Sequence, residues 1–214
     1  MAAVWYPGGQ DVRRTVNTQL LRAIQQENVE LKDEVSRLRD HVHALQALHH
    51  AIQQLLPEKD LMTLLDRTLY YAMTVLDASD GALMLTDEEK GDLVFVLVQG
   101  EVREKLPGYR IGRNEGIAGW VAEHREPVIV NNTRSDPRFS PRVDEAFHFQ
   151  TQSMVCVPLI ARGKVLGVIE VLNKAGDKPF AEADQDLLSI LAFIAAIALD
   201  DIARTPEENG GSAA

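Results

Sequence analysis

A seven-residue repeat of apolar side chains is the feature of this sequence that most restricts its fold. The repeat occupies residues 13–56, a stretch without glycine or proline. Leucine predominates at the d positions of the heptad, and β-branched residues occupy two of the a positions. This pattern predicts a parallel two-stranded coiled coil. The predicted seam between the two copies consists of Leu21, Ile24, Asn28, Leu31, Val35, Leu38, Val42 and Leu45.

The charged residues beside this seam favour the same arrangement. Glu27 and Glu34 occupy g positions. Lys32 and Arg39 occupy the e positions that follow, so a parallel dimer would bring opposite charges together across the two helices. Asn28 at an a position would bond to its counterpart and fix the register, at some cost in stability. The alternative is one long amphipathic helix packed on its own domain, but seam and charges agree independently on the dimer.

Composition and charge narrow the function classes. The chain has 214 residues, 45% of them hydrophobic, which is enough for one globular domain besides the coil. Its net charge is -10 and no run of lysine and arginine offsets it, so we expect no nucleic-acid partner. The single cysteine, Cys156, excludes an internal disulfide and a cysteine-based metal cage.

The same features predict a cytoplasmic location. The start of the sequence lacks the pattern of a secretion signal, and one cysteine fits a reducing compartment. The longest apolar run, residues 187–199, is shorter than the roughly 20 residues of a membrane helix. We therefore expect no membrane insertion.

The pattern of the chain changes after Pro57. Residues 58–78 form a predicted amphipathic helix, and the period then becomes that of strands. Strands are expected at 80–86, 91–100, 127–132, 153–160 and 164–173, and helices at 114–126 (with Trp120 inward), 143–147 and 181–204. This order predicts an α+β fold, with helices on one face of an antiparallel sheet and a long middle segment on the other.

Several segments of the folded part resemble one known family. They are EGIAGWVAEHREPVIVNN at 115–132, SDPRF at 135–139, SMVCVPLIARGKVLGVIEVLNK at 153–174, and Phe180 followed by Asp184. Together they resemble a GAF domain, the sensor module of cyclic-nucleotide phosphodiesterases and many bacterial signalling proteins. The resemblance spans residues 60–202 and implies a six-stranded antiparallel sheet, terminal helices on the dimer side and a ligand pocket roofed by the middle segment. The expected organisation is a disordered N-terminus (1–12), a coiled-coil helix (13–56), a GAF domain (58–203) and a disordered tail (204–214).

A signature of phosphodiesterase-type GAF domains lies at the end of the last predicted strand. The family carries Asn-Lys, then Phe, then Asp-Glu; here the matching residues are Asn173, Lys174, Phe180 and Asp184, with Gln185 in place of the glutamate. We interpret Lys174 and Asp184 as a pair that closes the loop over a buried Phe180. Because every GAF domain needs this junction, the motif supports the fold more than it supports a cyclic nucleotide.

The middle segment supplies the predicted ligand contacts. Arg138 could hold a phosphate or carboxylate, since a guanidinium donates to two oxygens at once. The neighbouring amides could orient a heterocycle. Asp136 can also simply start a turn, and Phe139 can also be a core side chain. The predicted ligand-binding residues are Asn131, Asn132, Arg138, Phe139, Thr151 and Ser153. The expected ligand is a small anion such as a cyclic nucleotide.

The sequence indicates no catalytic site, and it does not identify a cofactor. His148, between two phenylalanines, could be an axial haem ligand but has no second supporting feature. Cys156 does not match the cysteines that tether a bilin in phytochrome-type GAF domains. Some GAF domains reduce free methionine sulfoxide with two cysteines, whereas this chain has one. Because serine-triad, P-loop and zinc-site spacings are absent too, we expect no enzyme, no haem and no covalent bilin.

The sequence therefore predicts a homodimeric signalling sensor or scaffold. Binding of a small molecule would be transmitted through the coiled coil and the terminal helices to a protein partner that supplies the output. The alternative is a ligand-free GAF fold that serves as a dimerisation or docking module.

Overall fold

The chain divides into two compact units, residues 1–45 and 46–214. The computed structural model describes residues 20–22, 24–36, 39 and 60–204. The predicted disordered N-terminus, 1–12, lies outside these residues, and so does the predicted disordered tail, 204–214, except for its first residue, Arg204, which is the last residue of a helix.

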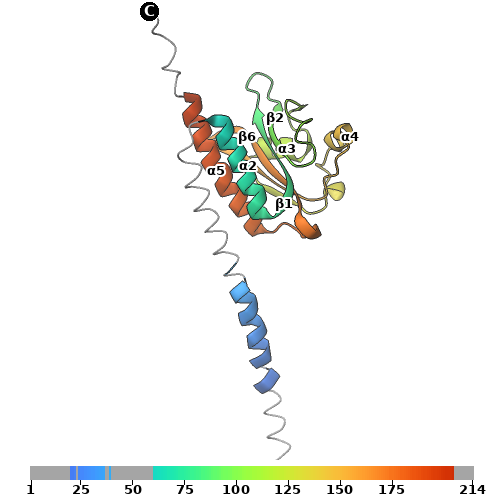
Figure 1. Ribbon diagram of the computed structural model, residues 1–214, viewed down its shortest axis with the longest axis vertical. Coiled ribbons are helices and arrows are strands. Elements are labelled where there is room, and N and C mark those ends of the chain that lie inside the picture. Colours follow the sequence, from blue (N-terminus) through green and yellow to red (C-terminus); the bar gives the residue numbers. More distant parts are fainter. Residues whose placement is uncertain (1–19, 23, 37–38, 40–59, 205–214) are drawn as a thin grey trace, which may run out of the picture. The chain divides into compact units, whose positions relative to one another are not determined.

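The first unit is helical wherever the structure describes it. Residues 20–22, 24–36 and 39 are helix, as the heptad pattern predicts (Figure 1). Their apolar seam residues are exposed in the single chain: Leu21, Ile24, Leu31 and Val35. The predicted seam residues Leu38, Val42 and Leu45 lie outside the described residues. The pairing of two such helices therefore stays a prediction.

The second unit is built on a six-stranded sheet in which every neighbouring pair of strands is antiparallel, which confirms the predicted fold class. The strand order is β3-β2-β1-β6-β5-β4. The strands are β1 (Ala78–Thr86), β2 (Leu93–Gln99), β3 (Arg110–Ile111), β4 (Val128–Val130), β5 (Met154–Ala161) and β6 (Lys164–Lys174).

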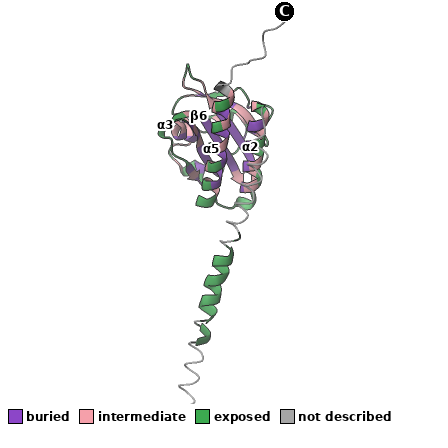
Figure 2. Ribbon diagram, turned by 90° about the vertical axis from the view of Figure 1, so that its left-hand side faces the viewer, coloured by how far each residue is buried: buried purple, intermediate pink, exposed green. Residues whose placement is uncertain are grey.

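Two long helices cover one face of this sheet. α2 (Leu61–Leu76) and α5 (Glu182–Arg204) lie side by side there (Figure 1). Figure 2 shows buried residues concentrated in the sheet behind these helices. The largest fully buried side chains of the two helices are leucines: Leu64, Leu65, Leu69, Leu76, Leu188 and Leu191. Among the described helices, none is both long and apolar enough to cross a membrane.

The middle segment crosses the opposite face of the sheet. It contains α3 (Gly116–His124), a 3-10 turn η1 (Thr133–Ser135) and α4 (Arg142–Phe147). We call residues 112–127 and 131–153 the roof. Trp120, expected to point inward, is only partly buried: its ring stacks on His124, and the Arg138 guanidinium lies 4.7 Å from the ring centroid.

A tight hairpin connects the neighbouring strands β5 and β6. Its turn residues Arg162 and Gly163 both have positive φ (49° and 77°), the geometry of the two-residue turns that match strand twist. Gly167 follows in β6, where a Cβ atom would lie 2.0 Å from the Met84 carbonyl oxygen of β1. The strands therefore approach closely here, just before the part of β6 that faces the roof.

Candidate ligand-binding site

A cavity of about 80 Å³ lies between the sheet and the roof. Its wall comes from β1, β2 and β6 below and from the roof above, and most of it is apolar. Phe95, Phe139, Phe149 and Met154 supply its larger side chains. The volume suffices for several water molecules, but it is smaller than the roughly 300–1,000 Å³ of ordinary small-molecule pockets.

A buried carboxyl group, Glu170, lines this cavity from the middle of β6. In the register of the sheet Glu170 stands between Ala82 of β1 and Cys156 of β5. The side chain is 8% exposed, and no described residue donates a hydrogen bond or forms an ion pair with it. Burial, and to a lesser extent the charge of Asp144, raises the pKa of Glu170 to about 8.

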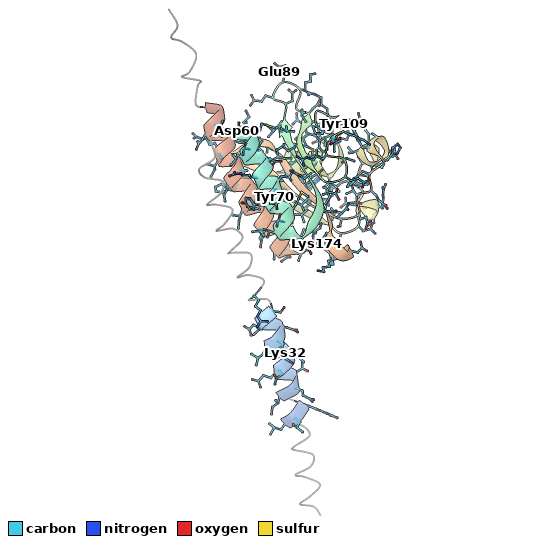
Figure 3. The ribbon with its side chains drawn as sticks, viewed as in Figure 1. Lys32, Asp60, Tyr70, Glu89, Tyr109 and Lys174 are labelled. Atoms are coloured by element: carbon cyan, nitrogen blue, oxygen red, sulfur yellow. The ribbon has the colours of Figure 1, made fainter. Side chains whose placement is uncertain are left out.

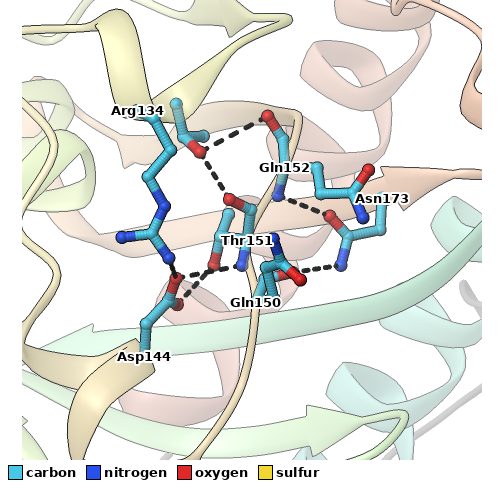
Figure 4. Close-up of polar contacts among 7 residues, drawn as sticks. Arg134, Asp144, Gln150, Thr151, Gln152 and Asn173 are labelled. Atoms are coloured by element: carbon cyan, nitrogen blue, oxygen red, sulfur yellow. Dashed lines mark hydrogen bonds and ion pairs between the residues drawn. The ribbon is translucent and has the colours of Figure 1, made fainter.

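A second buried carboxylate, Asp144 of α4, ties the segments of the roof to one another (Figure 4). Asp144 is 5% exposed and forms an ion pair with Arg134 at 2.9 Å. It also accepts hydrogen bonds from the Thr151 backbone N–H and hydroxyl, at 3.0 and 2.7 Å. The Thr133 hydroxyl donates in turn to the Thr151 carbonyl. These contacts satisfy Asp144 and fix α4 over the cavity.

Two further carboxylates line the cavity, and both have partners. Asp80 accepts the backbone N–H of Glu101 at 3.0 Å and the hydroxyl of Ser79 at 2.5 Å. Glu115 accepts the backbone N–H of Gly112 at 2.9 Å and pairs with Arg142 at 3.0 Å. No lysine, arginine or histidine is among the described residues that line the cavity. Glu170 is thus the acidic group of this wall that the described chain leaves without a partner.

The predicted ligand-binding residues are dispersed. Phe139 and Thr151 line the cavity, but Arg138 does not. Its guanidinium binds Asp136 in two places, with Nε to Oδ1 at 2.9 Å and Nη2 to Oδ2 at 2.7 Å. This contact lowers the pKa of Asp136 and raises that of Arg138. Arg138 is thereby engaged with its own loop and with Trp120.

Asn131, Asn132 and Ser153 also lie off the cavity. The Asn131 amide forms two hydrogen bonds with the backbone of Phe180, donating at 3.0 Å and accepting at 2.7 Å. Asn132 is exposed, and its carbonyl oxygen accepts the Ser135 hydroxyl. Asn131 and Ser153 border a separate polar hollow of about 520 Å³.

The signature residues form the bracket expected from the sequence. Lys174 Nζ lies 2.5 Å from Asp184 Oδ2, and Phe180 between them is 3% exposed. Asp184 also accepts the backbone N–H of Ala181, which caps the start of α5. Asn173 donates to the Gln150 carbonyl and accepts the Gln152 N–H (Figure 4), so it ties the end of β6 to the roof.

His148 and Cys156, the residues considered for haem and for thiol chemistry, differ in burial. His148 is an exposed residue at the C-terminal cap of α4, with φ of 55°. Cys156 is fully buried, and burial, with Glu170 nearby, raises the pKa of its thiol well above the usual value. No three histidine, cysteine, aspartate or glutamate side chains of the described residues are grouped closely enough to hold a metal ion.

Glu170 and Asp144 were not among the site residues predicted from the sequence. Glu170 is hidden inside an otherwise apolar run, Val165 to Leu172. The signal that could have revealed it is the alternation of a strand, because Val168, Glu170 and Leu172 must share one face. A single acid on the buried face of a central strand needs an explanation that packing does not provide.

The comparisons with known proteins agree on one family. A family model described as "GAF domain" matches residues 58–200. A probable 3',5'-cyclic phosphodiesterase, pde-5, of Caenorhabditis elegans is 30% identical over 145 residues, which are 62% of this chain and 19% of the relative. The dual 3',5'-cyclic-AMP and -GMP phosphodiesterase 11 of Drosophila melanogaster is 30% identical over 152 residues, 64% of this chain and 10% of that protein. The chain thus spans a fifth or less of these relatives.

Solved structures show the same fold. The GAF domain of a phosphoenolpyruvate-protein phosphotransferase from Coxiella burnetii superposes with a TM-score of 0.69 at 22% identity, covering 75% of this chain and 94% of the other. The free methionine-R-sulfoxide reductase of Neisseria meningitidis, solved with its substrate, gives 0.64 at 20% identity, with 75% and 90% covered.

Proposed function

Because this chain belongs to the GAF domain family, we propose that it is a non-catalytic sensor whose ligand occupies the cavity beneath the roof. GAF domains are small-molecule-binding signalling domains. The observation that carries the proposal is the unpartnered Glu170 carboxyl in an otherwise apolar cavity. Burying such a group without a partner costs stability, so its presence indicates a use outside the fold itself.

Catalysis is not part of this proposal. The chain has one cysteine, which cannot run the two-thiol cycle of a sulfoxide reductase. Its thiol is also buried, with a raised pKa that disfavours the thiolate. The phosphodiesterase activities named for the relatives belong to proteins of which this chain covers only 19% and 10%.

The sequence predicts a cyclic nucleotide or other small anion as the ligand, but the residues that line the cavity do not favour an anion. An anion would need a nearby cation or several donors. Arg138 is engaged with Asp136 away from the cavity, and the acidic side chains that line it would repel a phosphate. The ligand is therefore a small molecule of another charge class.

We further propose that two copies associate through α2 and α5 as well as through the coiled coil. The outer sides of these helices expose apolar residues: Met62, Tyr70, Ile190, Phe193 and Ile197. Tyr70 is labelled on α2 in Figure 3. Several exposed apolar side chains on two adjacent helices are typical of an interface. Movement of the roof would be transmitted through these paired helices to a protein partner, and that partner would supply the output of the sensor.

The alternative, a ligand-free docking module, is favoured by the small volume of the cavity. Native mass spectrometry of the full chain purified from its source cells separates the two. We expect a bound small molecule that is lost when Ala82→Leu fills the cavity, and that stays when the exposed Ala175 is changed to leucine. Wild-type protein that carries only its own mass would favour the docking module instead.

A further inference from the structure

The geometry of the cavity indicates the class of its ligand. We propose that it takes a small organic cation, a protonated amine or amidine on an apolar body, and that the Glu170 carboxyl recognises the positive group. This inference rests on the proposed small-molecule function of the same cavity. It assigns Glu170 as the residue that decides ligand specificity.

The Glu170 carboxyl is accessible from the cavity, and no described residue satisfies it from the sheet. Its neighbours across the sheet are Ala82, which has no polar side-chain atom, and Cys156, whose thiol is a weak donor. The side chain is 92% shielded, since its exposed fraction is 8%. No described residue bonds to the carboxyl, although it lines the cavity wall. A ligand in the cavity can therefore reach a carboxyl that the fold leaves unsatisfied.

The charges around the cavity select a cation. Asp80, Glu115, Asp144 and Glu170 all line it, and no described lysine, arginine or histidine does. The first three have donors of their own, so they do not compete for the ligand. Arginines outside the cavity lining partly balance the charges of Glu115 and Asp144. Asp80 accepts only uncharged donors among the described residues, so its charge leaves a negative field at the cavity. The field repels an anion and draws in a positive group, which finds a free acceptor at Glu170.

The remaining wall selects an organic body over a bare metal ion. The cavity is bordered mainly by aliphatic and aromatic side chains, among them Phe95, Phe139 and Phe149. The acidic side chains of the cavity are too dispersed to bind a metal ion, because the described residues contain no group of three metal-ligating side chains that could hold one. Aromatic faces, in contrast, contact organic cations favourably.

Binding of a cation should release a proton. The groups that face Glu170 are Asp144 from α4, Cys156 from β5, and Asp80 and Glu115 across the cavity. Burial and Asp144 raise the pKa of Glu170 to about 8, so the carboxyl is mostly protonated at neutral pH. An ammonium or amidinium group favours the carboxylate, and the proton leaves to solvent. Affinity should thus rise by about 50-fold between pH 6 and 8 and level off above that range.

Three probes of nearly identical shape test the charge class. Benzamidine is a cation, benzamide is neutral and benzoate is an anion over this pH range. We expect isothermal titration calorimetry of the full chain to show the tightest binding for benzamidine. Titrations at pH 7 in two buffers of different ionisation enthalpy should show release of close to one proton, a readout that needs no mutant.

Glu170→Gln tests the assigned residue. The amide keeps the shape of the carboxyl but cannot ionise, so benzamidine affinity at pH 8 should fall at least tenfold and its pH dependence should vanish. Glu126→Gln removes the same charge from an exposed position and should bind as the wild type does. Equal binding to Glu170→Gln, or binding without proton release, would overturn the inference.

The outcomes also separate this inference from the proposed function. If benzamide or benzoate binds in the cavity and benzamidine does not, the charge class is wrong while the sensor function stands. If no probe binds at millimolar concentration, the inference is overturned. The native mass spectrum then decides independently whether the sensor function survives.

Discussion

Replacing Glu170 by glutamine should stabilise the protein, and should do so increasingly as the pH rises. In the folded chain the pKa of Glu170 is raised from 4.5 to about 8, chiefly by burial. The folded state therefore holds this proton more tightly than the unfolded state. The contribution of the group to stability is complete below about pH 4.5 and is lost progressively as the pH rises to about 8.

The size of the effect follows from the width of this pH window. Each unit of pKa difference corresponds to ~1.4 kcal/mol, so the whole window represents about 5 kcal/mol. Between pH 5.5 and 8.5, where the protein can be compared directly, the gap between variant and wild type should widen by about 3 kcal/mol. This is a large part of the roughly 5–15 kcal/mol by which domains are stable.

Urea unfolding followed by circular dichroism, at fixed protein concentration and at several pH values, measures this gap. Glu126→Gln is the matched control, because Glu126 is exposed and its curve should run with that of the wild type. If Glu170→Gln and wild type give parallel stability curves from pH 5.5 to 8.5, the carboxyl is not the buried, unpartnered group described here.

Three further predictions concern the residues that shape the domain around the site, and a fourth concerns the predicted coiled coil. Phe180→Ala should cost about 3–5 kcal/mol in urea unfolding, since the ring is 3% exposed; a loss below about 1 kcal/mol would contradict its role under the loop. Lys174→Asp and Asp184→Lys should each destabilise, and the double exchange should be milder than either, because the two groups lie 2.5 Å apart; additive losses would argue against the pair. Gly167→Ala should lower the melting temperature by several degrees or prevent folding, because its Cβ would lie 2.0 Å from a backbone oxygen of the adjacent strand; unchanged melting would mean that the strands can separate. Asn28→Val should raise the melting temperature of the dimer while loosening its oligomeric state in sedimentation experiments; a wild-type monomer at micromolar concentration would refute the coiled coil.

The local elements could be predicted from the sequence because their signals are local. The alternation of apolar residues identified five of the six strands, whereas β3, which consists of Arg110 and Ile111 alone, is too short to show such a pattern. The bracket of Lys174 and Asp184 was also predictable, since both flank one short loop and only its closure had to be inferred. Periodicity and turn chemistry are properties of neighbouring residues.

The candidate site could not be predicted in this way. Arg138 is a well-placed cation in the sequence, yet in the fold it binds Asp136 and leaves the cavity to acidic groups. Glu170 lies inside an apolar run, and only the pairing of β6 with β1 and β5 leaves its carboxyl buried without a partner. Which polar groups find partners depends on segments that are distant in the chain and meet only when it folds. Sequence alone thus determined the elements and their family, while tertiary packing decided which charge the cavity presents, because burial and hydrogen bonding depend on the whole fold.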